Sequence, residues 1–113
     1  MTAVCEETVV CGLEVLQPNR GVAALLPDGT QVAVFRTNDD EVFALSNVDP
    51  FSGAAVLSRG IVGERNGVQV AVSPVYKQAF ELRTGVCVDD PGVSVRTFAV
   101  RVDPAGTILV SAG

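Results

Sequence analysis

The sequence predicts an all-β fold, an antiparallel β-sandwich or small barrel of about five to nine strands. Valine accounts for 22 of the 113 residues, and β-branched side chains pack well on sheets but lose rotamer freedom in helices. Short apolar runs alternate with turn signals about every eight to twelve residues, which is typical of all-β domains. The chain shows no long helical pattern, repeat or linker, so residues 1–113 fit one domain.

The predicted elements follow one another along the whole chain. The strands are residues 8–11, 21–26, 31–37, 41–45, 67–72, 79–82, 93–102 and 107–111. The turns between them are Pro27-Asp28-Gly29, Asn38-Asp39-Asp40, Asn66-Gly67 and Pro104-Ala105-Gly106. Asn66-Gly67 is the strongest hairpin signal, because Asn-Gly accommodates positive φ at both central residues. The core of the domain is expected to span residues 8–111, and residues 1–7 are expected to be flexible.

Three segments carry more detail. Val68, Val70 and Val72 alternate with less apolar neighbours, which predicts a strand buried on one face. The apolar residues of 93–102 change parity, so this run is expected to bulge, bend or divide into two strands at a corner. Residues 13–16 are a candidate for a single helical turn, closed by the proline that follows.

The composition excludes several classes of function. Eight Lys and Arg against 13 Asp and Glu give a net charge of −5, so neither a nucleic acid nor an anionic membrane is an expected partner. The absence of histidine excludes Ser-His and Cys-His nucleophilic systems and histidine metal sites. No apolar run approaches the roughly 20 residues of a membrane span, and the N-terminus lacks a signal-peptide pattern.

The cysteines indicate a reducing compartment. Cys5, Cys11 and Cys87 are odd in number and form no C-x-x-C motif, which favours free thiols in the cytoplasm. The spacing of Cys5 and Cys11 suits no common zinc site. Cys87 follows Gly85-Val86 and is expected to be buried.

Residues 47–59 and 73–79 show little strand periodicity and are expected to be loops. The sequence at these two loops resembles the ligand loops of the Rieske iron–sulfur domain. Those loops read Asn-x-Cys-x-His-x-Gly-Ala and Cys-Pro-x-His-Gly-x-x-Phe-x-x-x-Thr-Gly. The first segment here is Asn47-Val48-Asp49-Pro50-Phe51-Ser52-Gly53-Ala54. The second is Ser73-Pro74-Val75-Tyr76-Lys77-Gln78-Ala79-Phe80-Glu81-Leu82-Arg83-Thr84-Gly85. The matching framework residues are Asn47, Gly53, Ala54, Pro74, Phe80, Thr84 and Gly85.

All the cluster ligands are replaced in this sequence. Asp49 and Ser73 stand at the cysteine positions of the resemblance, and Phe51 and Tyr76 stand at the histidine positions. A Rieske cluster needs two thiolates on one iron and two imidazoles on the other. The resemblance therefore implies a Rieske-like fold without a [2Fe-2S] cluster.

The pattern resembles most closely the small subunit of NAD(P)H-dependent assimilatory nitrite reductase, over about Val10 to Val110. The motifs that carry this resemblance are Asp49-Pro50-Phe51-Ser52-Gly53-Ala54, Leu57-Ser58-Arg59-Gly60-Ile61-Val62-Gly63 and Ser73-Pro74-Val75-Tyr76-Lys77-Gln78. It implies a cofactor-free accessory subunit with no catalytic residues. Its partner would be a large subunit with siroheme, an iron–sulfur cluster and FAD, which reduces nitrite to ammonium. The alternative is a free-standing Rieske-like module that binds a small ligand or another redox partner.

The replaced positions have structural interpretations of their own. Asp49 is expected to accept hydrogen bonds from nearby backbone N–H groups, rather than to bind a metal ion with Asp89 and Asp90. Phe51 and Tyr76 are expected to fill the volume of the missing cluster, because an empty site would lose packing contacts. Tyr76 has a second interpretation as an exposed interface anchor.

The basic residues gather around the two loops in an otherwise acidic chain. Arg59, Arg65, Lys77 and Arg83 are either solvated surface charges or, with Tyr76, part of a surface that meets an acidic partner. Ser73 has no histidine to activate it, so it is not expected to act as a nucleophile.

Overall fold

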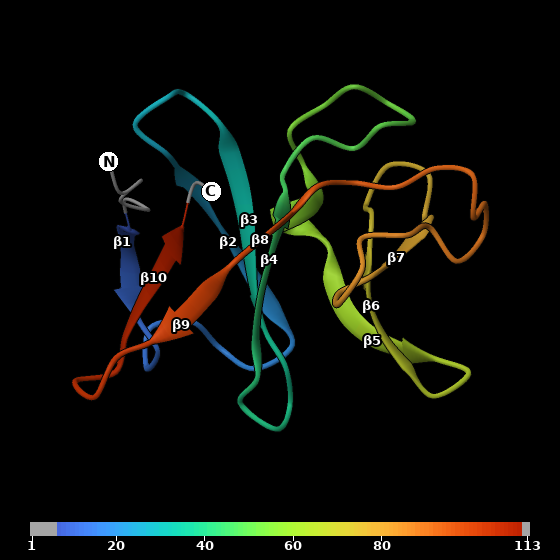
Figure 1. The fold of residues 1–113 in the computed structure, drawn as a ribbon. Coiled ribbons are helices and arrows are strands. Elements are labelled where there is room, and N and C mark those ends of the chain that lie inside the picture. Colours follow the sequence, from blue (N-terminus) through green and yellow to red (C-terminus); the bar gives the residue numbers. More distant parts are fainter. Residues whose placement is uncertain (1–6, 112–113) are drawn as a thin grey trace, which may run out of the picture.

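The computed structural model describes residues 7–111, which form three antiparallel sheets (Figure 1). The strands are β1 (Glu7–Gly12), β2 (Arg20–Leu25), β3 (Gln31–Arg36), β4 (Val42–Ser46), β5 (Ile61–Arg65), β6 (Val68–Val72), β7 (Ala79–Glu81), β8 (Thr97–Phe98), β9 (Val100–Val102) and β10 (Thr107–Ser111). A 3₁₀ turn, η1 (Leu57–Arg59), precedes β5. The sheet orders are β1-β10-β9, β2-β3-β4-β8 and β5-β6-β7. The predicted all-β antiparallel fold is confirmed, with ten strands in this part of the chain rather than the five to nine expected.

The four-stranded sheet lies between the other two and separates two hydrophobic cores (Figure 1). Val32 and Val34 of β3 belong to the core that includes β10, whereas Ala33 and Phe35 belong to the core that includes β6 and β7. Successive side chains of a strand face opposite sides, so a strand between two layers needs a continuous apolar run. Phe35 packs tightly against Gly21, where an added Cβ would lie 2.7 Å from the ring.

The change of parity in residues 93–102 marks a corner, as the sequence predicted. The chain leaves one sheet and enters another at Ala99, because β8 pairs with β4 whereas β9 pairs with β10. Phe98 is buried in the core that includes β10, so the corner is held by packing on its inner side.

Two predicted details were wrong. The sequence marked the Asn66-Gly67 hairpin, whose residues have φ values of 53° and 81°, but not the strand before it. β5 is an edge strand and mostly exposed, so it lacks the apolar alternation by which strands are recognised. In β6, Ala71 rather than a valine joins the core cluster, while Val70 is buried on the opposite face. The middle of β6 is therefore covered on both sides.

The candidate helical turn at residues 13–16 is a pair of overlapping tight turns. The Val15 N–H donates to the Gly12 carbonyl at 3.1 Å, and the Leu16 N–H donates to the Leu13 carbonyl at 3.2 Å. Leu16 is buried in the core that includes β10. The predicted flexible N-terminus lies almost entirely outside the described residues. Across residues 7–111 no helix is long and apolar enough to cross a membrane.

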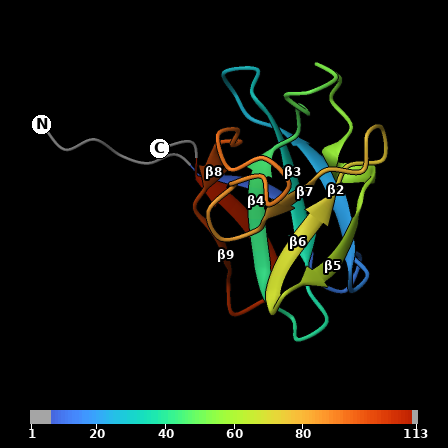
Figure 2. The same cartoon turned by 90° about the vertical axis from the view of Figure 1, so that its right-hand side faces the viewer.

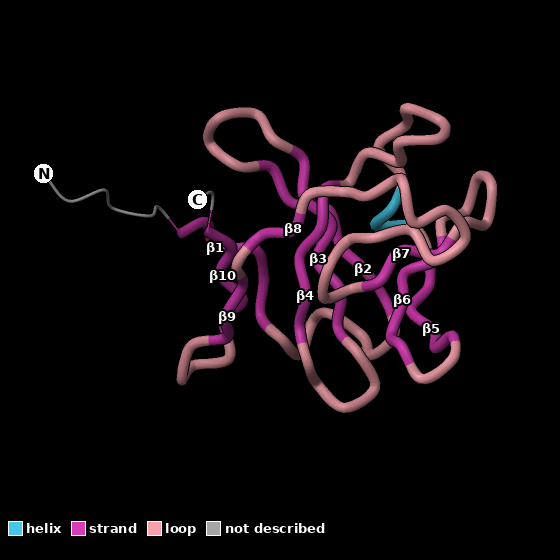
Figure 3. The backbone as a smooth tube through the Cα atoms, turned by 45° about the vertical axis from the view of Figure 1, so that its right-hand side comes forward, coloured by secondary structure: helices cyan, strands magenta, loops and turns pink. Residues whose placement is uncertain are grey.

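The loops after β4 and β6 emerge at the same end of the molecule, above the sheet of β5, β6 and β7 (Figure 1 and Figure 2). Figure 3 shows η1, in cyan, beside these loops. Two segments about two dozen residues apart in the sequence are thus brought together by the fold.

Candidate functional site: two paired loops

Residues 49–54 and 73–78, the first and second loop below, have the same backbone hydrogen bonds. In the first loop, the Asp49 N–H donates to the Ala54 carbonyl at 2.9 Å, and the Gly53 N–H donates to the Asp49 carbonyl at 2.7 Å. In the second loop, the Ser73 N–H donates to the Gln78 carbonyl at 2.9 Å, and the Lys77 N–H donates to the Ser73 carbonyl at 3.1 Å. Both loops have proline in their second position. The resemblance to the Rieske ligand loops is therefore visible in the backbone as well as in the sequence.

Each loop needs a left-handed residue at its fifth position. Gly53 has φ of 75° and Lys77 has φ of 63°. Glycine adopts this conformation freely, whereas a residue with a Cβ is disfavoured there by roughly 1–2 kcal/mol. Lys77 stands where the Rieske pattern has glycine, so the second loop keeps a side chain that its backbone does not favour.

The two cysteine-equivalent side chains meet inside the molecule. Asp49 and Ser73 are fully buried, and the Ser73 hydroxyl donates to the Asp49 carboxylate. The other Asp49 oxygen accepts the Phe51 N–H at 2.8 Å. The expected bond from Asp49 to nearby backbone is confirmed. The link to Ser73 was missed, because no local pattern connects residues that far apart in the chain.

The two histidine-equivalent side chains diverge. Phe51 packs against the core cluster of the β5–β7 half, with its ring centroid 6.2 Å from that of Phe80. Tyr76 is 58% exposed. The expectation that both aromatic rings fill interior volume therefore holds for Phe51, whereas it is wrong for Tyr76, which lies on the surface.

These four side chains do not match the ligand set of a [2Fe-2S] cluster. Phe51 has no donor atom, and Tyr76 and Ser73 offer hydroxyls in place of an imidazole and a thiolate. The Asp49 carboxylate already accepts two hydrogen bonds within the protein. Elsewhere in residues 7–111 there is no group of three or more Cys, Asp or Glu side chains placed to hold a metal ion.

The basic residues that flank the loops in the sequence divide into two kinds in the structure. Arg65 pairs with Asp89 at 2.7 Å, and Arg83 pairs with Glu41 at 2.9 Å. Asp89 also accepts the Ala79 N–H at 2.9 Å. That N–H and the Arg65 guanidinium hold the pKa of Asp89 below its usual value. Asp89 therefore anchors the end of the second loop.

Arg59 and Lys77 belong to the second kind. They flank a groove of about 390 Å³ between η1 and the second loop, with Ile61 on its wall. Within residues 7–111 the Lys77 ammonium donates to the Pro74 carbonyl alone, at 3.3 Å. Neither residue has a carboxylate partner among residues 7–111. Ile61 was not singled out from the sequence, because its strand was not recognised.

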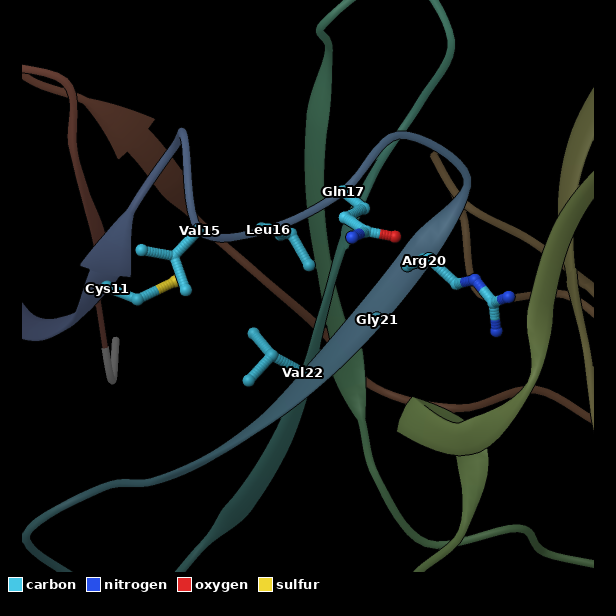
Figure 4. A pocket seen from close by; sticks show the side chains of 7 residues that line it. All are labelled: Cys11, Val15, Leu16, Gln17, Arg20, Gly21 and Val22. Carbon is cyan, nitrogen blue, oxygen red and sulfur yellow. The ribbon is translucent and has the colours of Figure 1, made fainter.

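A separate hollow lies between β1 and β2 (Figure 4). Cys11 is at one end of it and Arg20 at the other. Burial raises the pKa of the Cys11 thiol, which disfavours a reactive thiolate. Cys87 is fully buried, as the sequence predicted, and Cys5 lies outside the described residues.

Comparisons with known proteins agree with this geometry. A family model of the Rieske-like [2Fe-2S] domain matches residues 7–111. The nitrite reductase (NADH) small subunit of Escherichia coli (strain K12) is 45% identical over 94 residues, which cover 82% of this chain and 86% of that protein. The chain belongs to the Rieske-like family of nitrite reductase small subunits.

Two further proteins are similar to this chain. A crystal structure assigned as the NADH-dependent nitrite reductase small subunit from Mycobacterium tuberculosis has a TM-score of 0.95 and 52% identity, with 98% of each chain covered. The nitrite reductase [NAD(P)H] large subunit of Klebsiella oxytoca is 39% identical over 94 residues, which are 83% of this chain but only 10% of that protein. The family and fold expected from the loop motifs are thus confirmed.

Proposed function

We propose that this chain is an accessory subunit of an NAD(P)H nitrite reductase and carries no cofactor of its own. It binds a large subunit that holds FAD, an iron–sulfur cluster and siroheme, and that reduces nitrite to ammonium. The observation that carries the proposal is the paired-loop frame. The frame has the backbone hydrogen bonds of two matched ligand loops, but Asp49, Phe51, Ser73 and Tyr76 cannot supply the ligands.

The relative from Klebsiella oxytoca supports association with a large subunit. There a stretch similar to this chain forms part of a large-subunit polypeptide. Two domains joined in one chain experience a high effective concentration of each other, which favours a working contact between them. We infer that the separate chain described here makes the equivalent contact without a covalent link.

The chemistry of the described residues supports an accessory role. The chain has no histidine, and the two cysteines within residues 7–111 are one buried and one half-buried free thiol. The Ser73 hydroxyl donates to the Asp49 carboxylate, but both side chains are fully buried, so a substrate could not reach this pair. Free thiols also suit the cytoplasm, where we place the complex.

The proposal is tested by purifying the tagged chain from its native host grown on nitrite. The expected result is a large co-eluting polypeptide with siroheme absorbance. A colourless eluate with this chain alone, from a lysate that contains the large subunit, would favour the free-standing binding module. The purified chain is also treated with iron and sulfide under anaerobic conditions. We expect no stoichiometric iron and no visible iron–sulfur bands, and two irons per chain would overturn the cofactor-free role.

A further inference from the structure

We propose that Arg59, Ile61, Tyr76 and Lys77 form a docking face that binds an acidic segment of the large subunit. This inference rests on the proposed function and names the surface and the chemistry of the contact. The segment would carry carboxylates flanked by apolar side chains. The following observations distinguish Arg59 and Lys77 from the other loop cations and add Ile61 and Tyr76 to them.

The basic side chains differ in whether they already have a carboxylate partner within the described part of the chain. Arg36, Arg65 and Arg83 each have a carboxylate within 2.9 Å. Arg59 and Lys77 have none within residues 7–111, although the chain as a whole has a net charge of −5. A cation that is not matched inside an acidic protein is available to a carboxylate of a partner, and such complementarity sets the register of an interface.

The same face supplies apolar surface. Ile61 is 56% exposed and Tyr76 is 58% exposed. Ile61 lines the groove together with Arg59 and Lys77, and Tyr76 precedes Lys77 at the tip of the second loop. Tyrosine and arginine are enriched in the parts of interfaces that contribute most to affinity. A segment that is only acidic would leave these apolar side chains in water.

The backbone of Lys77 is a third observation. The equivalent position of the first loop is Gly53, and both residues are left-handed. Glycine would suit the second loop better than lysine does. Strained positions cluster at functional sites such as ligand clamps. A contact of the Lys77 side chain with the partner would account for a lysine at this position.

Arg20 extends the face along β2. The Asn19 carbonyl accepts the Val62 N–H at 3.2 Å, and the Cβ position of Gly21 lies 2.8 Å from the Ser58 carbonyl oxygen. Residue 20 therefore lies beside η1 and β5. Figure 4 shows its side chain directed away from Cys11, toward the yellow-green ribbon of these elements.

The test measures the affinity of the full-length chain for the purified large subunit by biolayer interferometry at low and moderate salt. Arg59→Gln/Lys77→Gln is compared with Arg65→Gln/Arg83→Gln, which removes the same total charge from two arginines that already have carboxylate partners. We expect about 30-fold weaker binding and a flatter salt dependence for the first pair, and less than about 3-fold for the control pair. Lys77→Gly is the second variant, because glycine suits the loop: we expect weaker binding with an unchanged or higher melting temperature.

The outcomes separate the two proposals. Equal affinities for both double variants, or wild-type affinity for Arg59→Gln/Lys77→Gln, would overturn the docking face while the subunit role stands. Failure of the wild-type chain to bind the large subunit would instead overturn the proposed function, and the docking face with it.

Discussion

The first and second loop share one backbone frame but direct their side chains differently. In the first loop, Phe51 packs on Phe80 and the left-handed position is a glycine. In the second loop, Tyr76 is exposed and the left-handed position is Lys77. The comparison shows that one backbone frame accommodates two different side-chain arrangements. One loop has become part of the core, and the other presents side chains to the exterior.

The ends of the two loops are also fixed by different chemistry. Asn47 is buried, and its side-chain oxygen accepts the Ser58 N–H at 2.7 Å behind the first loop. Asp89 is partly exposed and accepts the Ala79 N–H at 2.9 Å behind the second loop. A neutral buried amide fixes the inward-facing loop, whereas an ionisable group fixes the outward-facing one. The two anchors should therefore respond differently to pH.

The largest effect is expected where the loops meet. Asp49→Ala leaves the Ser73 hydroxyl and the Phe51 N–H without an acceptor in a buried site. We expect a loss of about 3 kcal/mol in the free energy of unfolding, measured by urea denaturation. Asp49→Asn is the matched control and should recover most of this loss, since its oxygen can accept the Phe51 N–H and its NH2 group can donate to the Ser73 hydroxyl oxygen. A loss below about 0.5 kcal/mol for Asp49→Ala would show that this contact does not hold the loops.

The next largest effect on stability should distinguish Phe51 of the first loop from Tyr76 of the second. Phe51→Ala removes a ring that packs on the core and should cost about 2 kcal/mol of unfolding free energy. Tyr76→Ala removes an exposed ring and should change that free energy by less than about 0.5 kcal/mol. Thermal melts followed by circular dichroism provide the comparison. Equal losses for the two variants would contradict the assignment of one loop to the core and the other to the surface.

A smaller change in the free energy of unfolding should have opposite signs at the fifth positions of the two loops. An added Cβ at Gly53 meets no atom within 4 Å, so Gly53→Ala tests the left-handed backbone alone. We expect it to destabilise the protein by about 1 kcal/mol, and Lys77→Gly to stabilise it by up to about 1 kcal/mol. Chemical denaturation of both variants checks this prediction. Shifts of the same sign would mean that the loops do not share one backbone constraint.

Sequence reasoning succeeded where the pattern is local or the motif is specific. The turn at Asn66-Gly67, the corner near Ala99 and the family all followed from short stretches of sequence. β5 was missed because its exposed residues show no periodicity. The Asp49–Ser73 contact and the exposure of Tyr76 depend on how two distant loops pack, which no local pattern encodes. The ion pairs that remove Arg65 and Arg83 from the available cations likewise appear only in three dimensions.

The smallest effect tests the anchors. The pKa of Asp89 lies below its usual value of about 3.9, because the Ala79 N–H and Arg65 favour the carboxylate. The unfolded chain therefore binds this proton more readily, and the stabilisation by Asp89 is present above about pH 4 and is lost as the pH falls through the folded pKa. The side chain is 39% exposed, so the contribution should be below about 1 kcal/mol.

The difference in stability between wild type and Asp89→Asn, measured by urea denaturation from pH 6 to pH 3, isolates this contribution from the other carboxylates. It should shrink as the pH falls below about 4. The stability lost in Asn47→Ala should stay constant over the same range, because the amide of Asn47 does not titrate. A stability difference for Asp89→Asn that stays constant with pH would mean that the anchor of the second loop does not depend on pH either. The two loops would then differ only in the side chains at their tips.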